Sequence, residues 1–107
     1  MIKKLIVALA TMMGMFFLGT GNVQAEWVTM EVTAYTHTGN PTASGEWPYV
    51  GGVAANDFAI GSILVIDGIE YIVNDRSGAP HIIDIFMDTY DECMQFGRQY
   101  KEVYVKR

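Results

Sequence analysis

Short apolar segments separated by turn residues make up most of the chain after residue 26, and this pattern restricts the fold more than any other feature. Residues 27–36 alternate between apolar and polar side chains, as in a strand with one buried face. Shorter apolar runs follow at 52–55, 62–66, 69–73, 82–87 and 101–105. Asp67 and Gly68, which separate two of these runs, are typical of a tight hairpin turn. The pattern predicts about six strands closed into a small β-barrel.

One short helix is predicted just before the last strand. Thr89 and Glu92 have the spacing of a capping box, in which each residue satisfies a free backbone group of the other. Gly97 fits the position just past the end of such a helix. The segment therefore predicts a helix of about two turns.

The first 25 residues have the pattern of a secretory signal peptide. Lys3 and Lys4 precede an apolar run at 5–18, and Ala25 is the small residue that a signal peptidase accepts. An uncleaved membrane anchor is the alternative, but the apolar run is short for a span of about 20 residues. We expect cleavage after Ala25, which leaves residues 26–107 as one small domain that is secreted and has no membrane contact.

The expected mature domain is acidic and has no disulfide. Without Lys3 and Lys4, five of the seven basic residues remain against 12 acidic ones, a net charge of −7. Such a charge disfavours nucleic acid as a partner. Cys93 is the only cysteine, and we expect it to be a buried, inert thiol. An exported domain of this size must then rely on its core alone, which favours a closed sheet.

A carboxylate interrupts the most apolar of the predicted strands. Asp84 lies between Ile83 and Ile85, and a carboxylate in such a run is costly unless it is paired, hydrogen-bonded or protonated. Asp75 ends the preceding strand, and a turn leads from it towards Asp84. If the two strands come together, the two carboxylates approach each other. Asp88, four residues beyond Asp84, would lie roughly 13 Å away and is too far for a direct pair.

Two interpretations of these carboxylates remain open from spacing alone. A carboxylic acid whose pKa is raised by burial or by a second carboxylate can protonate a leaving oxygen, and glycosidic bond cleavage often uses such a group. Alternatively, Asp75 caps its turn and Asp84 is held by backbone amides. The long loop at 37–52 adds a second hint of function, because loops of this length in small domains are usually functional or disordered.

The chain resembles the "3D" domain family of bacterial cell-wall proteins, named for three aspartates. The resemblance rests on TAYTHTGNPTASG at 33–45, VGGVAA at 50–55, the segment 59–78, IIDIFMD at 82–88 and FGRQYKEVYV at 96–105. These segments cover nearly the whole of residues 26–107. The resemblance implies a six-stranded double-psi β-barrel with one short helix, similar to the core of membrane-bound lytic transglycosylase A.

The resemblance also implies an activity. Related proteins cleave the β-1,4 bond between N-acetylmuramic acid and N-acetylglucosamine in peptidoglycan without adding water, because the muramic acid 6-hydroxyl attacks its own C1. One aspartate serves as acid and then as base. That role falls on Asp84, with Asp75 as the supporting aspartate. Peptidoglycan glycan strands are then the expected partner of a monomer, and the mechanism needs no metal or cofactor.

The resemblance implies further substrate contacts, but the chain also departs from the family pattern at two of the aspartate positions. Thr36, Thr42 and Ser44 match the TAYT and TASG positions, where each either hydrogen-bonds a sugar or the catalytic acid or holds its loop together. Trp47 either stacks on a sugar ring or covers the core, and Asp57 is a further candidate for substrate binding. The turn at Asp75 reads DRSG instead of the family's DTGG. At the remaining family aspartate the chain has Asn56, with Asp57 one position later. These departures motivate the alternative hypothesis of a wall-associated glycan-binding module that has lost catalysis.

Overall fold

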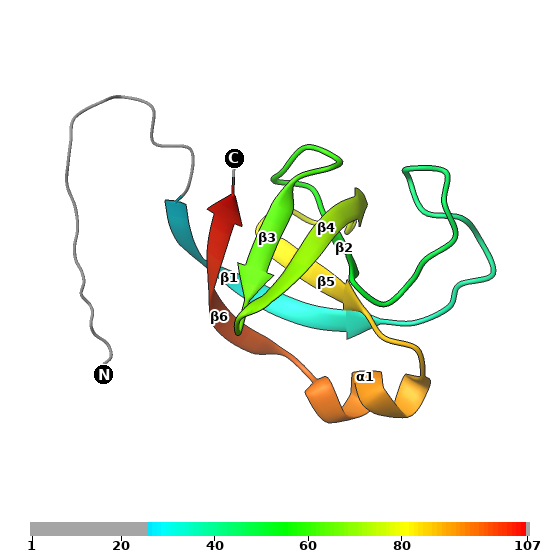
Figure 1. Cartoon of the computed structure of the whole chain (residues 1–107). Helices are drawn as coiled ribbons and strands as arrows, with labels where there is room; N and C mark the ends of the chain where they lie inside the picture. The colour runs from blue at the N-terminus through cyan, green and yellow to red at the C-terminus, as the bar shows by residue number, and fades with distance from the viewer. Residues whose placement is uncertain (1–25, 107) are drawn as a thin grey trace, which may run out of the picture.

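Six strands close into a barrel, in the order β1-β5-β2-β4-β3-β6 around the wall. The computed structural model describes residues 26–106, so the predicted signal peptide lies outside the described residues. The one helix of this part of the chain, α1, lies across the base of the barrel between β5 and β6 (Figure 1). The predicted mainly β fold, a closed six-stranded barrel with one short helix, is confirmed.

The observed elements agree closely with the segments predicted from the apolar pattern. The strands are β1 Glu26–Tyr35, β2 Gly52–Ala55, β3 Ile63–Ile66, β4 Ile69–Asp75, β5 Ile82–Phe86 and β6 Gln99–Lys106, and the helix is α1 Tyr90–Phe96. The β3–β4 hairpin turns at Asp67 and Gly68, both of which have positive φ, as the type of turn expected there requires.

The barrel interleaves strands that are far apart in the sequence. β1 pairs with β5 and β2 pairs with β4 in parallel, whereas the other four pairings are antiparallel. β2 therefore lies between β5 and β4. The strands that carry Asp84 and Asp75 do not pair with each other, because β2 lies between them.

Alternate side chains of every strand fill the barrel. The interior is aliphatic, and its fully buried members include Val32, Leu64, Val73, Ile83 and Val103. Ile83 and Ile85 point inward, so the intervening Asp84 points out of the barrel. The apolar neighbours of Asp84 in the sequence thus belong to the core, while Asp84 itself belongs to the outer surface.

α1 begins and ends as its sequence predicts. The Thr89 side chain accepts a hydrogen bond from the Glu92 amide, the Glu92 side chain accepts one from the Thr89 amide, and Gly97 is the C-cap with φ 67°. No residue of α1 is fully buried. Cys93 is a free thiol and is partly exposed, so the expectation of a buried thiol is wrong. In residues 26–106, no helix is long and apolar enough to cross a membrane.

Candidate active site

Four residues on adjacent strands form one row across the outer surface of the barrel. Ala54 of β2 is in register with Asp84 of β5 on one side and with Asp75 of β4 on the other. Thr33 of β1 is in register with Asp84. We call Thr33, Asp84, Ala54 and Asp75 the aspartate row. Because Ala54 has the smallest side chain that a strand residue other than glycine can have, it leaves space between the two carboxylates.

A β-bulge places Asp75 in this row. The pairing of β2 with β4 shifts between Val53 and Ala54, so that Val53 faces Val73 but Ala54 faces Asp75. Asn74 is the extra residue of the bulge. Without this shift, Asp75 would point to the other face of the sheet, since side chains alternate along a strand. Bulges often re-aim a side chain beside a functional site in this way.

Asp84 is half-buried and has one direct hydrogen-bond partner. The Thr33 hydroxyl donates to Asp84 Oδ1 at 2.9 Å. Burial raises the pKa of the Asp84 carboxyl above its ordinary value, and the charge of Asp75 adds to the rise. The Thr33 hydrogen bond and the more distant Arg98 guanidinium act in the opposite direction. The surroundings of Asp84 therefore favour its protonated form more than water does.

Asp75 is held by the backbone and by Tyr35. Its Oδ1 accepts hydrogen bonds from the Ala43 and Arg76 amides, both at 2.9 Å, and its Oδ2 lies 3.5 Å from the Tyr35 hydroxyl, which donates to it. The Ala43 contact ties the long loop between β1 and β2 to the end of β4. Asp75 is thus fixed in orientation by two backbone amides and the Tyr35 hydroxyl.

Tyr35 lies close to both carboxylates, and our sequence analysis missed it. Burial raises the pKa of Tyr35 to about 12, and the charges of Asp75 and Asp84 contribute to this rise. The Tyr35 ring also packs edge-on against Phe86, with centroids 5.5 Å apart. The alternation of β1 could have indicated this residue, because Thr33 and Tyr35 continue the face opposite the core-facing Val32.

A close contact between Asn74 and Gly52 lies next to the bulge. Asn74 is 2% exposed, and a Cβ at position 52 would lie only 2.5 Å from Asn74 Nδ2. The Asn74 carbonyl accepts a hydrogen bond from the Ser44 amide at 3.0 Å. Glycine is therefore required at position 52 because the bulged side chain occupies the space beside it.

Thr42 and Ser44, predicted to contact substrate, hold the long loop together. The Thr42 hydroxyl lies 2.8 Å from the Ser44 hydroxyl and donates to the Glu46 carbonyl at 2.8 Å. Thr42 is 6% exposed and so has little surface left for a ligand. These contacts favour a structural role for both residues, which position the segment that carries Ala43.

Asn56 and Asp57 are also engaged within the protein. Asn56 Oδ1 accepts a hydrogen bond from the Ser77 amide at 2.9 Å. Asp57 accepts one from the His81 amide at 3.0 Å and pairs with His81 Nδ1 at 2.9 Å. Both residues therefore fasten the loop between β4 and β5. The structure does not bring Asp57 into the aspartate row.

A cleft of about 520 Å³ opens between β1 and α1, and its wall includes Thr33, the hydrogen-bond partner of Asp84. Tyr35 of β1 and Thr36, just after the end of that strand, also line it. Arg98, at its edge, pairs with Glu31. Thr36 is thus the one predicted substrate contact that lies in this cleft. Trp47 projects from the long loop with 64% of its side chain exposed and does not line the cleft.

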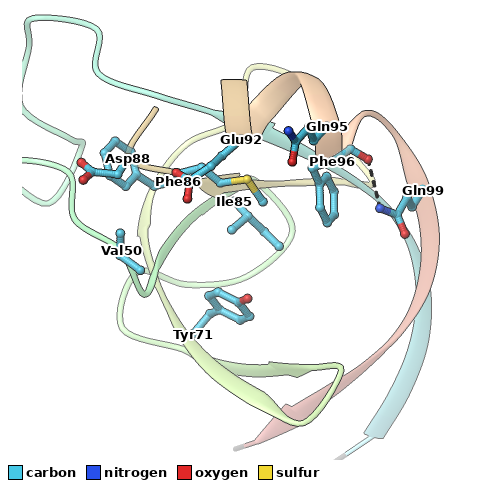
Figure 2. Close-up of a pocket in the computed structure, with 10 residues that line it drawn as sticks. Val50, Tyr71, Ile85, Phe86, Asp88, Glu92, Gln95, Phe96 and Gln99 are labelled. Carbon is cyan, nitrogen blue, oxygen red and sulfur yellow. Dashed lines mark hydrogen bonds between the residues drawn. The ribbon is translucent and has the colours of Figure 1, made fainter. Parts of the chain in front are cut away.

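A larger cleft, of about 680 Å³, lies at the mouth of the barrel and not at the aspartate row. Figure 2 shows Tyr71 and Ile85 inside this mouth and Asp88 and Glu92 at its rim. Asp88 also lies 3.1 Å from His37 Nε2, at the start of the long loop. We place the candidate chemistry at the smaller cleft, because Thr33 of its wall hydrogen-bonds Asp84.

No protein-family model matches the chain, and no curated protein matches it. The resemblance to the 3D domain family therefore stays a prediction. Within residues 26–106, no group of three or more histidine, cysteine, aspartate or glutamate side chains is arranged to hold a metal ion.

Proposed function

We propose that this protein is a secreted member of the 3D domain family that cleaves peptidoglycan glycan strands as a lytic transglycosylase, with Asp84 as the acid and base. The single observation that carries the proposal is the aspartate row. It combines a half-buried carboxyl of raised pKa with a second carboxylate on the same outer face. Two carboxyl groups in unequal environments are the usual basis of acid–base chemistry at a glycosidic bond.

Asp84 first acts as a general acid. Its protonated carboxyl donates to the oxygen that links N-acetylmuramic acid to N-acetylglucosamine, and the bond from that oxygen to C1 breaks. The proton stays on the leaving hydroxyl, and positive charge develops on the muramic acid ring. The raised pKa supports this step because it increases the fraction of Asp84 that carries a proton at neutral pH.

Asp84 then acts as a general base. The carboxylate left by the first step accepts the proton of the muramic acid 6-hydroxyl while that oxygen bonds to C1. The products are a 1,6-anhydro end and a free N-acetylglucosamine end, and Asp84 regains its proton. The Thr33 hydrogen bond favours the ionised form that exists between the two steps.

Asp75 and Tyr35 support this chemistry as positioning residues. Asp75 is fixed by two backbone amides, and its charge adds to the rise in the pKa of Asp84. Tyr35 lies near both carboxylates and donates to Asp75. The cleft between β1 and α1, whose wall includes the Asp84 partner Thr33, is the place where we position the glycan strand.

A glycan-binding module without catalysis is the second candidate function. Both oxygens of Asp75 already have protein partners, and Asn56 and Asp57 are engaged in fastening a loop. These contacts favour structural roles for the residues at two of the three family aspartate positions. Such a module would bind peptidoglycan and release no product.

Product analysis distinguishes the two functions. Purified peptidoglycan is incubated with the protein, and the released fragments are identified by mass spectrometry. We expect 1,6-anhydro-muramic ends, and we expect Asp84→Asn to lower their rate of release by about 100-fold or more. Asp91→Asn is the matched control, since it removes an exposed aspartate of α1 and should retain activity.

Three outcomes would contradict the lytic mechanism. Reducing ends instead of anhydro ends would mean that water attacks C1. Equal activity of the Asp84→Asn variant and the wild type would remove Asp84 from the reaction. Binding to peptidoglycan by a folded protein that releases no fragment would favour the second candidate function.

A further inference from the structure

A second surface of the barrel exposes aromatic rings on the opposite flank of β1. Trp27 of β1 is in register with Tyr104 of β6, and their ring centroids are 5.0 Å apart. Trp27 and Tyr100 are 64% and 74% exposed. We call Trp27, Tyr104 and Tyr100 the aromatic face. Large aromatic side chains so exposed usually mark a contact surface, because water is a poor environment for their rings.

A hollow of about 410 Å³ lies within this face. Trp27 and Tyr100 line it together with Glu102 and Lys101 of β6 and with Asp67 of the β3–β4 turn. Tyr100 and Tyr104 are four residues apart on one strand, so their Cα atoms are roughly 13 Å apart. That separation leaves room for more than one sugar ring between the outer aromatic side chains.

The charged groups of the hollow are already paired within the protein. Lys101 Nζ lies 2.8 Å from Asp67 Oδ2, and the Thr29 hydroxyl donates to Glu102 Oε2 at 2.8 Å. Their remaining donor and acceptor sites stay available at the hollow. The surface therefore offers hydrogen bonds without a strong cationic charge, and this excludes a polyanion as its natural ligand.

We propose that the aromatic face is a carbohydrate-binding surface for the pyranose rings of a glycan backbone, separate from the site at Asp84. The C–H face of a pyranose is apolar and stacks on an exposed indole or phenol ring. Its equatorial hydroxyls are donors and acceptors that match Glu102, Asp67 and Lys101. A flat, partly apolar and strongly hydroxylated ligand suits this combination better than a lipid surface, because the carboxylates would lose hydration in a membrane.

Together with the proposed function, this inference gives the protein two surfaces that contact the same glycan polymer, the aspartate row and the aromatic face. A glycan strand held at the aromatic face raises the effective concentration of neighbouring strands at the aspartate row. The inference does not require Asp84 to be catalytic, because the two faces share no side chain. A binding module without catalysis would use the aromatic face in the same way.

Single-tryptophan variants test the location of binding directly. The chain has two tryptophans, Trp27 and Trp47, with equal exposed fractions. In the Asp84→Asn background, which prevents cleavage, each is replaced in turn by phenylalanine and the protein is titrated with N-acetylglucosamine hexasaccharide. We expect the oligosaccharide to change the fluorescence of Trp47→Phe, which retains Trp27. We expect no change for Trp27→Phe.

Sedimentation with insoluble peptidoglycan tests the contribution of each ring in the same background. Trp27→Ala and Tyr100→Ala should each weaken binding by about 10-fold, which corresponds to the loss of a stacking contact. Tyr49→Ala is the matched control, because Tyr49 is a tyrosine of the long loop with 39% exposure and lines neither the hollow nor either of the two clefts. Its binding should equal that of the parent protein. Thermal unfolding of each variant establishes that it is folded.

Four results would overturn the inference. One is weaker binding with Tyr49→Ala but unchanged binding with Trp27→Ala, which would place the glycan at the long loop. Another is the absence of any saccharide binding by the folded Asp84→Asn protein. The third is a dimer that dissociates in Trp27→Ala without any change in saccharide binding, which would make the face a contact between copies. The fourth is binding to phosphatidylcholine vesicles, lost in Trp27→Ala, in place of saccharide binding.

Discussion

The aspartate row and the aromatic face are two outer surfaces of one barrel, and β1 contributes to both. Residues 26–32 of β1 pair with β6, and residues 31–35 pair with β5. The first half therefore presents Trp27 and Thr29 beside β6, and the second half presents Thr33 and Tyr35 beside β5. Both sets of side chains come from the same alternation, since Val32 and Met30 between them point into the core.

The two surfaces differ in how far they are covered. At the aspartate row, the long loop reaches the end of β4 through Ala43, and Asp84 is half-buried. At the aromatic face, the rings of Trp27 and Tyr100 remain open to water. Partial burial changes the protonation of a carboxyl, whereas exposure leaves an aromatic ring free for contact. β1 thus contributes to the proposed catalytic site at its C-terminal end and to the proposed binding surface at its N-terminal end.

The largest expected effect that separates the two surfaces comes from Gly52→Ala. The new Cβ would lie 2.5 Å from Asn74 Nδ2, so the bulge beside Asp75 must shift. We expect unfolding in denaturant to show a loss of about 1–3 kcal/mol, as for other overpacked sites. Peptidoglycan cleavage should fall, while oligosaccharide binding at the aromatic face should remain.

The double variant Gly52→Ala/Asn74→Ala provides the control. Removing the Asn74 amide relieves the contact, so the double variant should be more stable than the sum of the two single effects predicts. Strict additivity would mean that the Gly52 and Asn74 positions do not interact as described. Loss of oligosaccharide binding in a folded Gly52→Ala protein would mean that the two surfaces are not independent.

The sequence predicted the barrel well because each strand carries its own signal. Alternation identified β1, the Asp67 and Gly68 turn identified the β3–β4 hairpin, and the capping box identified α1. Strand order carried no such local signal, because β2 enters between β5 and β4 through contacts between distant segments. The sequence therefore left open whether the strands of Asp75 and Asp84 come together, and the structure places the two residues on either side of Ala54.

The candidate site was predictable only in part, for two physical reasons. Asp84 was conspicuous because a carboxylate is costly in an apolar run. Tyr35 looked like any strand aromatic, and only the closed barrel brings its hydroxyl to Asp75. Thr42 and Ser44 matched family positions, but a sequence pattern does not distinguish a hydroxyl that binds a ligand from one that binds its own loop.

A smaller effect is expected in the pH dependence of stability. The folded-state pKa of Asp84 is raised above the ordinary aspartate value of 3.8, mainly by burial. The folded protein therefore binds the Asp84 proton more tightly than the unfolded chain does. Because of this, the contribution of Asp84 to stability falls as the pH rises from 3.8 through the folded-state pKa. Asp84→Asn removes this loss.

Urea unfolding from pH 3 to pH 7 measures this effect. The stability of Asp84→Asn relative to the wild type should increase as the pH rises, by less than about 1 kcal/mol, because water screens a half-exposed carboxyl. Asp91→Asn, on the exposed first turn of α1, should show no such gain. A relative stability of Asp84→Asn that falls with rising pH would mean that the ionised Asp84 is favoured by folding.

The smallest expected effect compares two threonines of β1, one on each surface. Thr33 donates to Asp84 and Thr29 donates to Glu102, in both cases from a hydroxyl to a carboxylate oxygen. Thr33→Val removes a hydrogen bond that lowers the pKa of Asp84, so this pKa should rise further. Thr29→Val should leave it unchanged. The measurement is an NMR titration of the aspartate carboxyl carbons, with the Asp84 signal assigned by its loss in Asp84→Asn.

The same pair of variants links the titration to catalysis. In the proposed mechanism, the first step needs protonated Asp84. The rate of glycan cleavage should therefore fall as the pH rises through the pKa of this carboxyl. Thr33→Val should move that fall to higher pH by the amount seen in the titration, and Thr29→Val should not move it. A shifted pKa with an unshifted pH profile would mean that the group limiting cleavage at high pH is not Asp84. Equal shifts of the pH profile in Thr33→Val and Thr29→Val would mean that the charge of Glu102 affects the pKa of Asp84. The two surfaces would then be electrostatically coupled.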